Sequence, residues 1–182
     1  MLFFCYIILS VIIKVNMSKI ILILDNIRSI HNVGSILRTA DGFGVSSVLF
    51  CGYTPYPKLK DDSRLPHEFE KTTRAIHKTA LGAETTVKCA IYASTKDAIT
   101  QAKAEGYVIV ALEQSKSSIP LQTYNSTQPV AIVLGNEVEG ITSDTLSLCD
   151  VIIEIPMFGK KESFNVSVAT AICLYELTKE TR

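Results

Sequence analysis

From residue 19 onward, short apolar runs alternate with stretches in which apolar residues recur at helical spacing. This alternation is typical of βαβ units and a mainly parallel sheet. The apolar runs predict six strands, at Lys19–Leu24, Ser47–Cys51, Val87–Ala93, Tyr107–Leu112, Val130–Leu134 and Val151–Ile155. The helical spacing predicts helices at Asn32–Gly42, Phe69–Leu81, from Ser94 or Thr95 to Glu105, from Ser143 to near Cys149, and at Asn165–Lys179.

The segments between these elements are predicted to be loops. Gly52–Pro66 carries three prolines, and a polar stretch runs from the end of the fourth strand through Gln128. We find no internal repeat, so one α/β domain with helices flanking the sheet accounts for residues 17–182.

The first thirteen residues, MLFFCYIILSVII, do not share this pattern, because they are almost wholly apolar. They lack the basic start and the cleavage site of a secretory signal, and they are shorter than the about 20 residues of a spanning helix. Met17 then opens MSKIILILDN, which is typical of the start of an α/β domain. We interpret residues 1–16 as an extension that does not belong to the mature fold, and a membrane anchor is the alternative.

Charge and cysteine content exclude several classes of protein. The 182 residues include 18 Lys and Arg and 18 Asp and Glu, so the formal net charge is zero. A strongly basic protein that wraps nucleic acid is therefore excluded, while a local basic patch remains open. The five cysteines are never spaced as CxxC. They favour free thiols in a reducing cytoplasm over a disulfide framework or a zinc site.

Three polar clusters stand at ends of the predicted elements, and the usual nucleotide signatures GxGxxG and Walker A are absent. Residues 25–45 (DNIRSIHNVGSILRTADGFGV) place Asn32 at a helix start and Arg38 six residues later. Residues 130–142 (VAIVLGNEVEGIT) break a buried strand at Gly135, where parallel sheets bind ligands. Residues 155–169 (IPMFGKKESFNVSVA) join a strand to a helix that Ser163 or Asn165 caps. Taken singly, each cluster is also explained by helix capping or an ordinary turn.

Together and in this order, the clusters resemble the three motifs of the SpoU (TrmH-like) class of the SPOUT superfamily, which are S-adenosylmethionine-dependent RNA ribose 2′-O-methyltransferases. The resemblance covers about residues 19–179 and is closest in IPMFGKKESFNVSVATAICLYE, with Phe164 where leucine is more usual. Two features of many relatives are not found here, a separate N-terminal RNA-binding domain and a basic C-terminal extension. These departures put the identity of the RNA in doubt.

The resemblance implies a deep trefoil knot in the C-terminal part of the chain and a site for S-adenosylmethionine, with no metal ion. The residues that would bind the donor are Leu112, Leu134, Gly135, Asn136, Gly140, Ile155, Met157, Ser163 and Phe164. The residues that would carry the reaction are Asn32, Arg38, Glu137, Ser163 and Asn165. Arg38 would act as a base or, since a guanidinium is a poor base, by binding a phosphate and stabilising a developing alkoxide.

The expected partners are tRNA or rRNA and a second copy of the chain. Basic residues gather between positions 58 and 78, at Lys58, Lys60, Arg64, Lys71, Arg74 and Lys78. They predict a phosphate-binding patch, and a solvated mixed face is the alternative. Tyr53, Tyr56 and Phe69 would either stack on an unpaired base or pack locally. Relatives dimerise through the last helix. A catalytically inactive RNA-binding protein and a membrane-tethered protein are the competing hypotheses.

Overall fold

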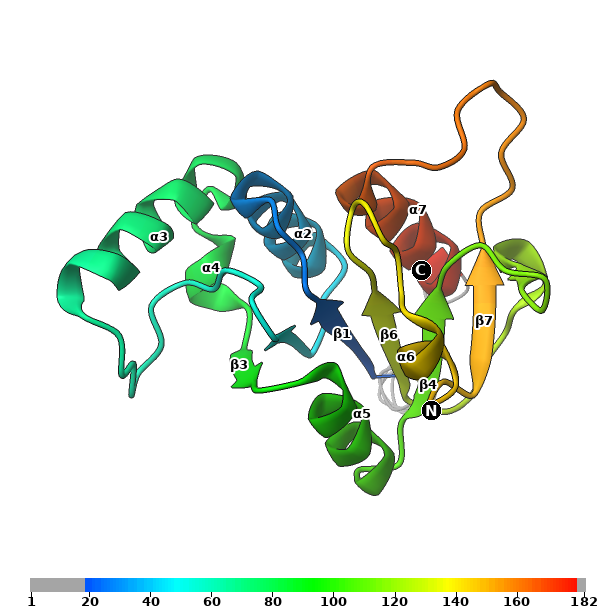
Figure 1. Ribbon diagram of the computed structural model, residues 1–182, viewed down its shortest axis with the longest axis horizontal. Coiled ribbons are helices and arrows are strands. Elements are labelled where there is room, and N and C mark those ends of the chain that lie inside the picture. The colour runs from blue at the N-terminus through cyan, green and yellow to red at the C-terminus, as the bar shows by residue number, and fades with distance from the viewer. Residues whose placement is uncertain (1–18, 180–182) are drawn as a thin grey trace, which may run out of the picture.

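Seven parallel strands form one sheet at the centre of the computed structural model, which describes residues 19–179 (Figure 1). The strand order is β3-β2-β1-β6-β4-β7-β5. The strands are β1 (Ile20–Asp25), β2 (Ser47–Cys51), β3 (Cys89–Tyr92), β4 (Val108–Leu112), β5 (Ile119–Pro120), β6 (Val130–Leu134) and β7 (Val151–Glu154). The predicted α/β class with a mainly parallel sheet is therefore confirmed.

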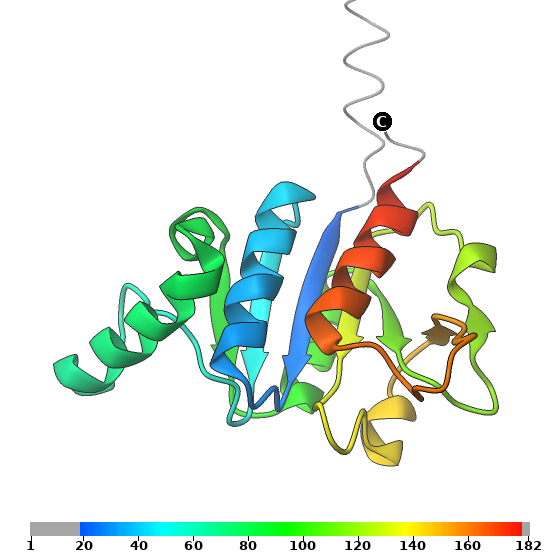
Figure 2. The ribbon, with the colours of Figure 1, turned by 90° about the horizontal axis from the view of Figure 1, so that it is seen from above.

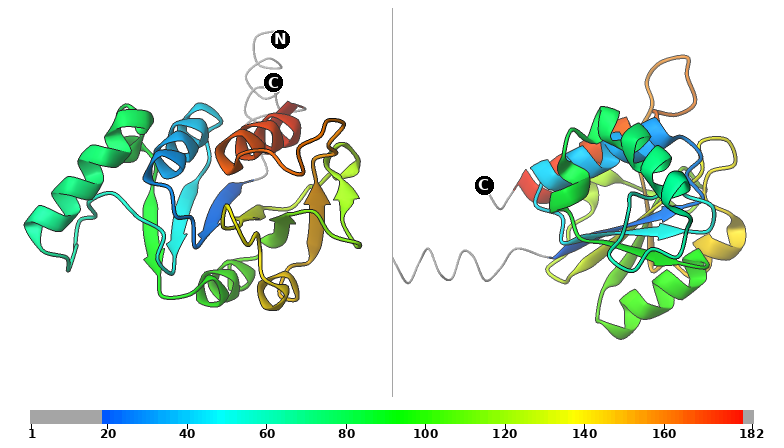
Figure 3. Two further views of the ribbon diagram at one scale, coloured as in Figure 1. Left: turned by 45° about the horizontal axis from the view of Figure 1, so that its top comes forward. Right: turned by 90° about the vertical axis from the view of Figure 1, so that its left-hand side faces the viewer.

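Helices cover both faces of this sheet (Figure 3). On one face lie α2 (Ile30–Gly42), α3 (Pro66–Ala80), α4 (Ala83–Thr86), η1 (Leu121–Thr123) and α7 (Val166–Thr178). On the other lie α5 (Thr95–Ala104) and α6 (Ser143–Leu146). Alternate strand residues feed the two cores: Leu22 and Leu24 face α2 and α7, whereas Ile21 and Ile23 face α5. A strand buried on both faces reads as a continuous apolar run, which is why β1 and β6 were recognisable.

Several predicted helix boundaries were wrong, because residues at the helix ends set them locally. Helix α2 begins at Ile30 with Ser29 as its N-cap, so Asn32 does not open the helix. Helix α3 begins at Pro66, three residues before the predicted start, because proline suits the first helical turn. Helix α6 begins at Ser143 with Thr142 as its N-cap, and it ends at Leu146 rather than near Cys149. Of the predicted alternatives, Ser94 rather than Thr95 caps α5, and Asn165 rather than Ser163 caps α7.

Three short elements were missed. Helix α4 follows α3 after a turn in which Leu81 adopts a left-handed conformation, with φ of 52°. Strand β5 and η1 lie in the segment predicted to be only a polar loop. All three are four residues or fewer, too short to show a period in the sequence.

The predictions for residues 1–16 lie outside the described residues. Within residues 19–179, no helix is long and apolar enough to cross a membrane.

Helices α2 and α3 cross at Gly34, which predicts a measurable effect on stability. A Cβ atom on Gly34 would lie 2.1 Å from Thr79 Oγ1 and 2.5 Å from the carbonyl oxygen of Ile76. We expect Gly34→Ala to lower the free energy of unfolding by about 1–3 kcal/mol, because the helices must move apart. Gly42, in the same helix, has no atom within 4 Å of its Cβ position. Gly42→Ala is therefore the matched control and should be neutral or stabilising by up to about 1 kcal/mol. Urea denaturation of both variants measures the difference, and equal losses would refute the crossing contact.

Candidate functional site

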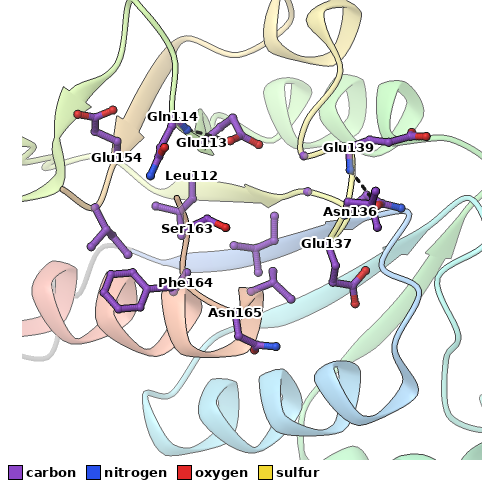
Figure 4. Close-up of a pocket in the computed structure, with 17 residues that line it drawn as sticks. Leu112, Glu113, Gln114, Asn136, Glu137, Glu139, Glu154, Ser163, Phe164 and Asn165 are labelled. Atoms are coloured by element: carbon purple, nitrogen blue, oxygen red, sulfur yellow. Dashed lines mark hydrogen bonds between the residues drawn. The ribbon is translucent and has the colours of Figure 1, made fainter. Parts of the chain in front are cut away.

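A cavity of about 470 Å³ opens at the carboxyl ends of β4, β6 and β7, beside the start of α7 (Figure 4). Carboxyl ends of parallel strands are where open α/β sheets bind ligands, and the volume is in the range of small-molecule sites. The lining residues are Leu112, Glu113, Gln114, Leu134, Gly135, Asn136, Glu137, Val138, Glu139, Gly140, Glu154, Ile155, Ser163, Phe164, Asn165, Val166 and Ala169.

A chain of hydrogen bonds joins the three sequence clusters at the edge of this cavity. Asn165 Nδ2 donates to Asn32 Oδ1 at 3.1 Å, and Asn32 Nδ2 donates to Glu137 Oε1 at 2.8 Å. The Glu137 carboxylate also accepts the backbone N–H groups of Arg28 at 2.9 Å and Ser29 at 3.0 Å. We call Asn165, Asn32 and Glu137 the polar relay. It connects residues 133 positions apart in the sequence.

The local conformations explain why these side chains meet. Asn165 caps α7 through Oδ1, which accepts from the backbone N–H of Ser167 at 2.9 Å, and this leaves its amide nitrogen for Asn32. Glu137 lies at the positive start of α2, where a carboxylate is stabilised by free N–H groups. Partial burial alone would raise the pKa of Glu137, but the hydrogen bonds from Arg28, Asn32 and Ser29 outweigh it, and the pKa lies below its usual value. Glu137 is therefore ionised at neutral pH.

The loop from Gly135 to Gly140 is folded back on itself. Asn136 Oδ1 accepts the N–H groups of Val138 and Glu139, while its Nδ2 donates to the carbonyl of Asn26 and to Tyr53 Oη. The amide of Asn136 is therefore used inside the protein and shapes the loop. A Cβ atom on Gly135 would lie 2.6 Å from the carbonyl carbon of Gly140. Glycine is thus required at position 135 by the fold of the loop itself, and Gly135 also lines the cavity.

Most residues expected to bind a donor lie along the cavity. Leu112, Leu134 and Ile155 form apolar wall, and Gly135, Asn136, Gly140, Ser163 and Phe164 also line it. Met157 is not among the lining residues of the described chain. Among those expected to carry the reaction, Glu137, Ser163 and Asn165 line the cavity, and Asn32 reaches it through the polar relay.

Arg38 lies apart from this group. Its side chain is exposed on α2, and it makes no hydrogen bond or ion pair with any residue between 19 and 179. Six residues separate it from Asn32, which places it about 9 Å further along the helix axis. The guanidinium does not line the cavity within one described chain, and it is free to bind an external group such as an RNA phosphate or ribose.

Two carboxylates of the cavity were missed by the sequence analysis. Glu113 Oε2 accepts the N–H of Ile141 at 2.8 Å, and Glu154 Oε2 accepts Ser118 Oγ at 2.7 Å. Both stand at the end of a predicted strand, β4 or β7, and that position was the available signal. Together with Glu137 and Glu139 they give the cavity an acidic rim above apolar walls. Such a cavity suits a ligand that has an apolar or aromatic part and a positive charge.

The predicted basic patch is divided by the structure. Arg64 forms an ion pair with Asp62, donates to the carbonyls of Tyr56 and Pro57, and stacks on the Tyr56 ring at 3.6 Å. Lys58 Nζ lies 4.8 Å from the centre of the Phe69 ring. These aromatic side chains pack locally. Lys60, Lys71, Arg74 and Lys78 are exposed, and the last three share the outer face of α3.

Comparisons with known proteins agree with this geometry. The profile of the SpoU rRNA Methylase family matches residues 19–175. The chain is 32% identical over 157 residues to the tRNA (guanosine(18)-2′-O)-methyltransferase of Escherichia coli (strain K12), covering 86% of this chain and 62% of that protein. It is 33% identical over 161 residues to the 23S rRNA (guanosine-2′-O-)-methyltransferase RlmB of Nitrosomonas europaea, covering 88% and 56%. The chain thus spans about three fifths of the length of these relatives.

Solved structures show the same fold. The AdoMet-bound rRNA methyltransferase from Sinorhizobium meliloti matches with a TM-score of 0.72 and 28% identity over 89% of this chain and 56% of that one. The A. aeolicus TrmH/SpoU tRNA modifying enzyme matches with a TM-score of 0.72 and 28% identity over 91% and 78%. Since the profile covers nearly all of the described residues and its three motifs meet at one cavity, the chain belongs to the SpoU rRNA Methylase family.

Proposed function

We propose that the protein is an S-adenosylmethionine-dependent RNA methyltransferase that acts on a ribose 2′-hydroxyl of tRNA or rRNA. The observation that carries this proposal is the polar relay, which brings one residue from each motif to the edge of the cavity. The named activities of the tRNA and rRNA relatives support the reaction and the substrate class.

The cavity fits the methyl donor. Its apolar walls, Leu112, Leu134 and Ile155, suit an adenosine, and its acidic rim suits the positive charge of a sulfonium. When bound, S-adenosylmethionine supplies an electrophilic methyl group. The backbone of the Gly135–Gly140 loop and of Ile155, with Ser163 and Phe164, would hold it.

The chain's own residues would position the acceptor. Asn165, Asn32 and Glu137 fix one another and leave a rigid polar edge against which a ribose can be oriented. A 2′-hydroxyl is a poor nucleophile at neutral pH, so negative charge that develops on its oxygen must be stabilised. Arg38 would do this, or hold the adjacent phosphate, through a planar fork of N–H groups.

The test is methyl incorporation into RNA from a strain that lacks the gene. Purified protein and labelled S-adenosylmethionine should restore one 2′-O-methyl nucleoside in its tRNA or rRNA, identified by nucleoside mass spectrometry. Binding of the donor without methylation of any of these RNAs would instead support the inactive RNA-binding protein.

Two architectural features belong to the same proposal. A trefoil knot in the C-terminal part is supported by the insertion of β6 between β1 and β4 and by the contact of α7 with η1.

A homodimer through α7 is supported by apolar side chains on its outer face, where Val168 is 46% and Tyr175 55% exposed. Light scattering that showed a monomer at micromolar concentration would refute the dimer.

RNA attraction must be local, because the net charge of the chain is zero. We expect replacement of Lys71, Arg74 and Lys78 by glutamine to weaken RNA binding and to lower its log–log salt slope by up to about 2, at about 0.7 per lost phosphate contact. Replacing three exposed lysines elsewhere, Lys88, Lys96 and Lys116, removes the same charge and is the control. An equal change in both triple variants would show that α3 is only a solvated face.

A further inference from the structure

The loop between β7 and α7 carries the most exposed large apolar side chain of residues 19–179. Phe158 is 96% exposed, whereas its neighbours Pro156 and Met157 are partly buried. We call residues 156–162 the Phe158 loop, and it projects beyond the ends of β7 and α7 (Figure 1). Seen from above, it runs from the end of β7 to the start of α7 (Figure 2). A phenyl ring held in water gives up the stabilisation that burial would provide. This raises the question of what partner covers it.

The charge beside Phe158 identifies the chemistry of that partner. Lys160 and Lys161 are exposed, and neither forms an ion pair with a described residue. The cavity has an acidic rim that suits a positively charged ligand, and two lysines would repel such a ligand. The partner of the Phe158 loop therefore differs from the ligand of the cavity. An aromatic ring next to two unpaired cations instead matches an unpaired nucleotide, whose base stacks and whose phosphates are anionic.

The position of the loop relates this contact to the functional site. Both of its ends lie at the cavity, because Ile155 precedes the loop and Ser163 and Phe164 follow it, and all three are lining residues. Gln114 Nε2 donates to the carbonyl of Glu162 at 2.8 Å and fixes the end of the Phe158 loop that leads to α7. A nucleotide bound at the tip would therefore be a near neighbour of one bound at the cavity.

We propose that Phe158 stacks on an unpaired base close to the methylated nucleotide, while Lys160 and Lys161 bind the adjoining phosphates. This inference rests on the proposed function, and it adds that the RNA is single-stranded where it meets this loop.

The absence of tryptophan from the chain makes the contact directly observable. Phe158→Trp introduces a single indole, whose fluorescence should be quenched by a single-stranded RNA of about 12 nucleotides. The same strand in a duplex, or S-adenosylmethionine alone, should leave it unchanged. Ile91→Trp, on the edge strand β3 and 48% exposed in the parent chain, is the matched control and should not respond. Quenching by the donor alone would overturn the proposal, because the ring would then cover the cavity.

Affinity provides the second measurement. Phe158→Ala should weaken binding of the single-stranded RNA by about 5- to 150-fold, the range for loss of one base–aromatic stack, and leave donor affinity unchanged. Phe158→Tyr should retain binding. The contact would be refuted if Phe158→Ala bound the RNA with wild-type affinity. It would also be refuted if the variant changed its oligomeric state and kept its RNA affinity. Failure of the proposed function is distinct, since the wild-type protein would then methylate no RNA.

Discussion

Replacing Arg38 by alanine is expected to abolish methyl transfer while leaving the affinity for S-adenosylmethionine within a few fold. The side chain is exposed and forms no hydrogen bond or ion pair with residues 19–179, so its removal should not disturb the fold or the cavity. Loss of a group that stabilises developing charge lowers kcat by about 100-fold or more, and each tenfold loss corresponds to about 1.4 kcal/mol of transition-state stabilisation. Single-turnover methylation of the true RNA and a donor titration measure the two effects separately.

Two further variants sharpen this test. Arg38→Lys should also fail, because lysine keeps the charge but lacks the planar fork. Lys96→Ala removes an exposed cation from α5 and should keep full activity. If Arg38→Ala turned over the RNA at nearly the wild-type rate, the assignment of Arg38 to the reaction would be wrong.

Glu137→Gln is expected to lower kcat by about 100-fold with smaller changes in the KM values for donor and RNA. The Glu137 carboxylate accepts three hydrogen bonds, from Arg28, Ser29 and Asn32. A glutamine offers one oxygen, and its amide N–H groups would face these donors. Asn32 would then lose its fixed orientation, and small misplacements of positioning groups have effects of this size. Steady-state kinetics distinguish this from simple loss of binding.

The pH dependence of stability provides an independent readout of the same contact. The folded-state pKa of Glu137 lies below its usual value. The ionised carboxylate therefore stabilises the fold above the unfolded pKa of about 4.3, and this contribution is lost as the pH falls through the folded pKa. Urea denaturation of Glu137→Gln should show less acid destabilisation than the wild type. Glu105→Gln, on the surface at the end of α5, is the control. If Glu137→Gln kept the wild-type kcat, Glu137 would not be one of the residues that position the ribose.

The sequence predicted what depends on local patterns. The limits of β2 and β6 agree with the prediction, and Ser94 and Asn165 were recognised as caps, since buried strands and capping residues leave their mark within a few positions. The sequence placed Asn32 at a helix start, and the resemblance placed it among the residues that carry the reaction. Its side chain contacts Glu137 and Asn165, more than 100 residues away. Only the folded chain shows that contact.

The remaining features depend on how segments come together in space. The only mark on Glu113 in the sequence is its position after the strand that ends at Leu112, and its partner Ile141 belongs to another loop. Arg64 and Lys58 were counted as free cations because a sequence shows charge but not the ion pair with Asp62 or the ring beneath Lys58. In each case the deciding contact depends on the folded conformation of an irregular segment, for which there is no periodic signal.

The position of Glu137 also links the two ligands thermodynamically. Its carboxylate belongs to the loop that lines the cavity, and it holds the backbone of Arg28 and Ser29, which leads into α2 with Asn32 and Arg38. A donor that orders this loop therefore also orders the start of α2, where the RNA would bind. The binding of the donor and the binding of the RNA are then linked by a coupling free energy. By the reciprocity of linkage, whatever factor the methyl donor contributes to the affinity for RNA, RNA must contribute to the affinity for the donor. The demethylated donor lacks the transferred methyl group and the positive charge. Where the demethylated donor orders the loop less well than the methyl donor, the same coupling favours release of the RNA after transfer.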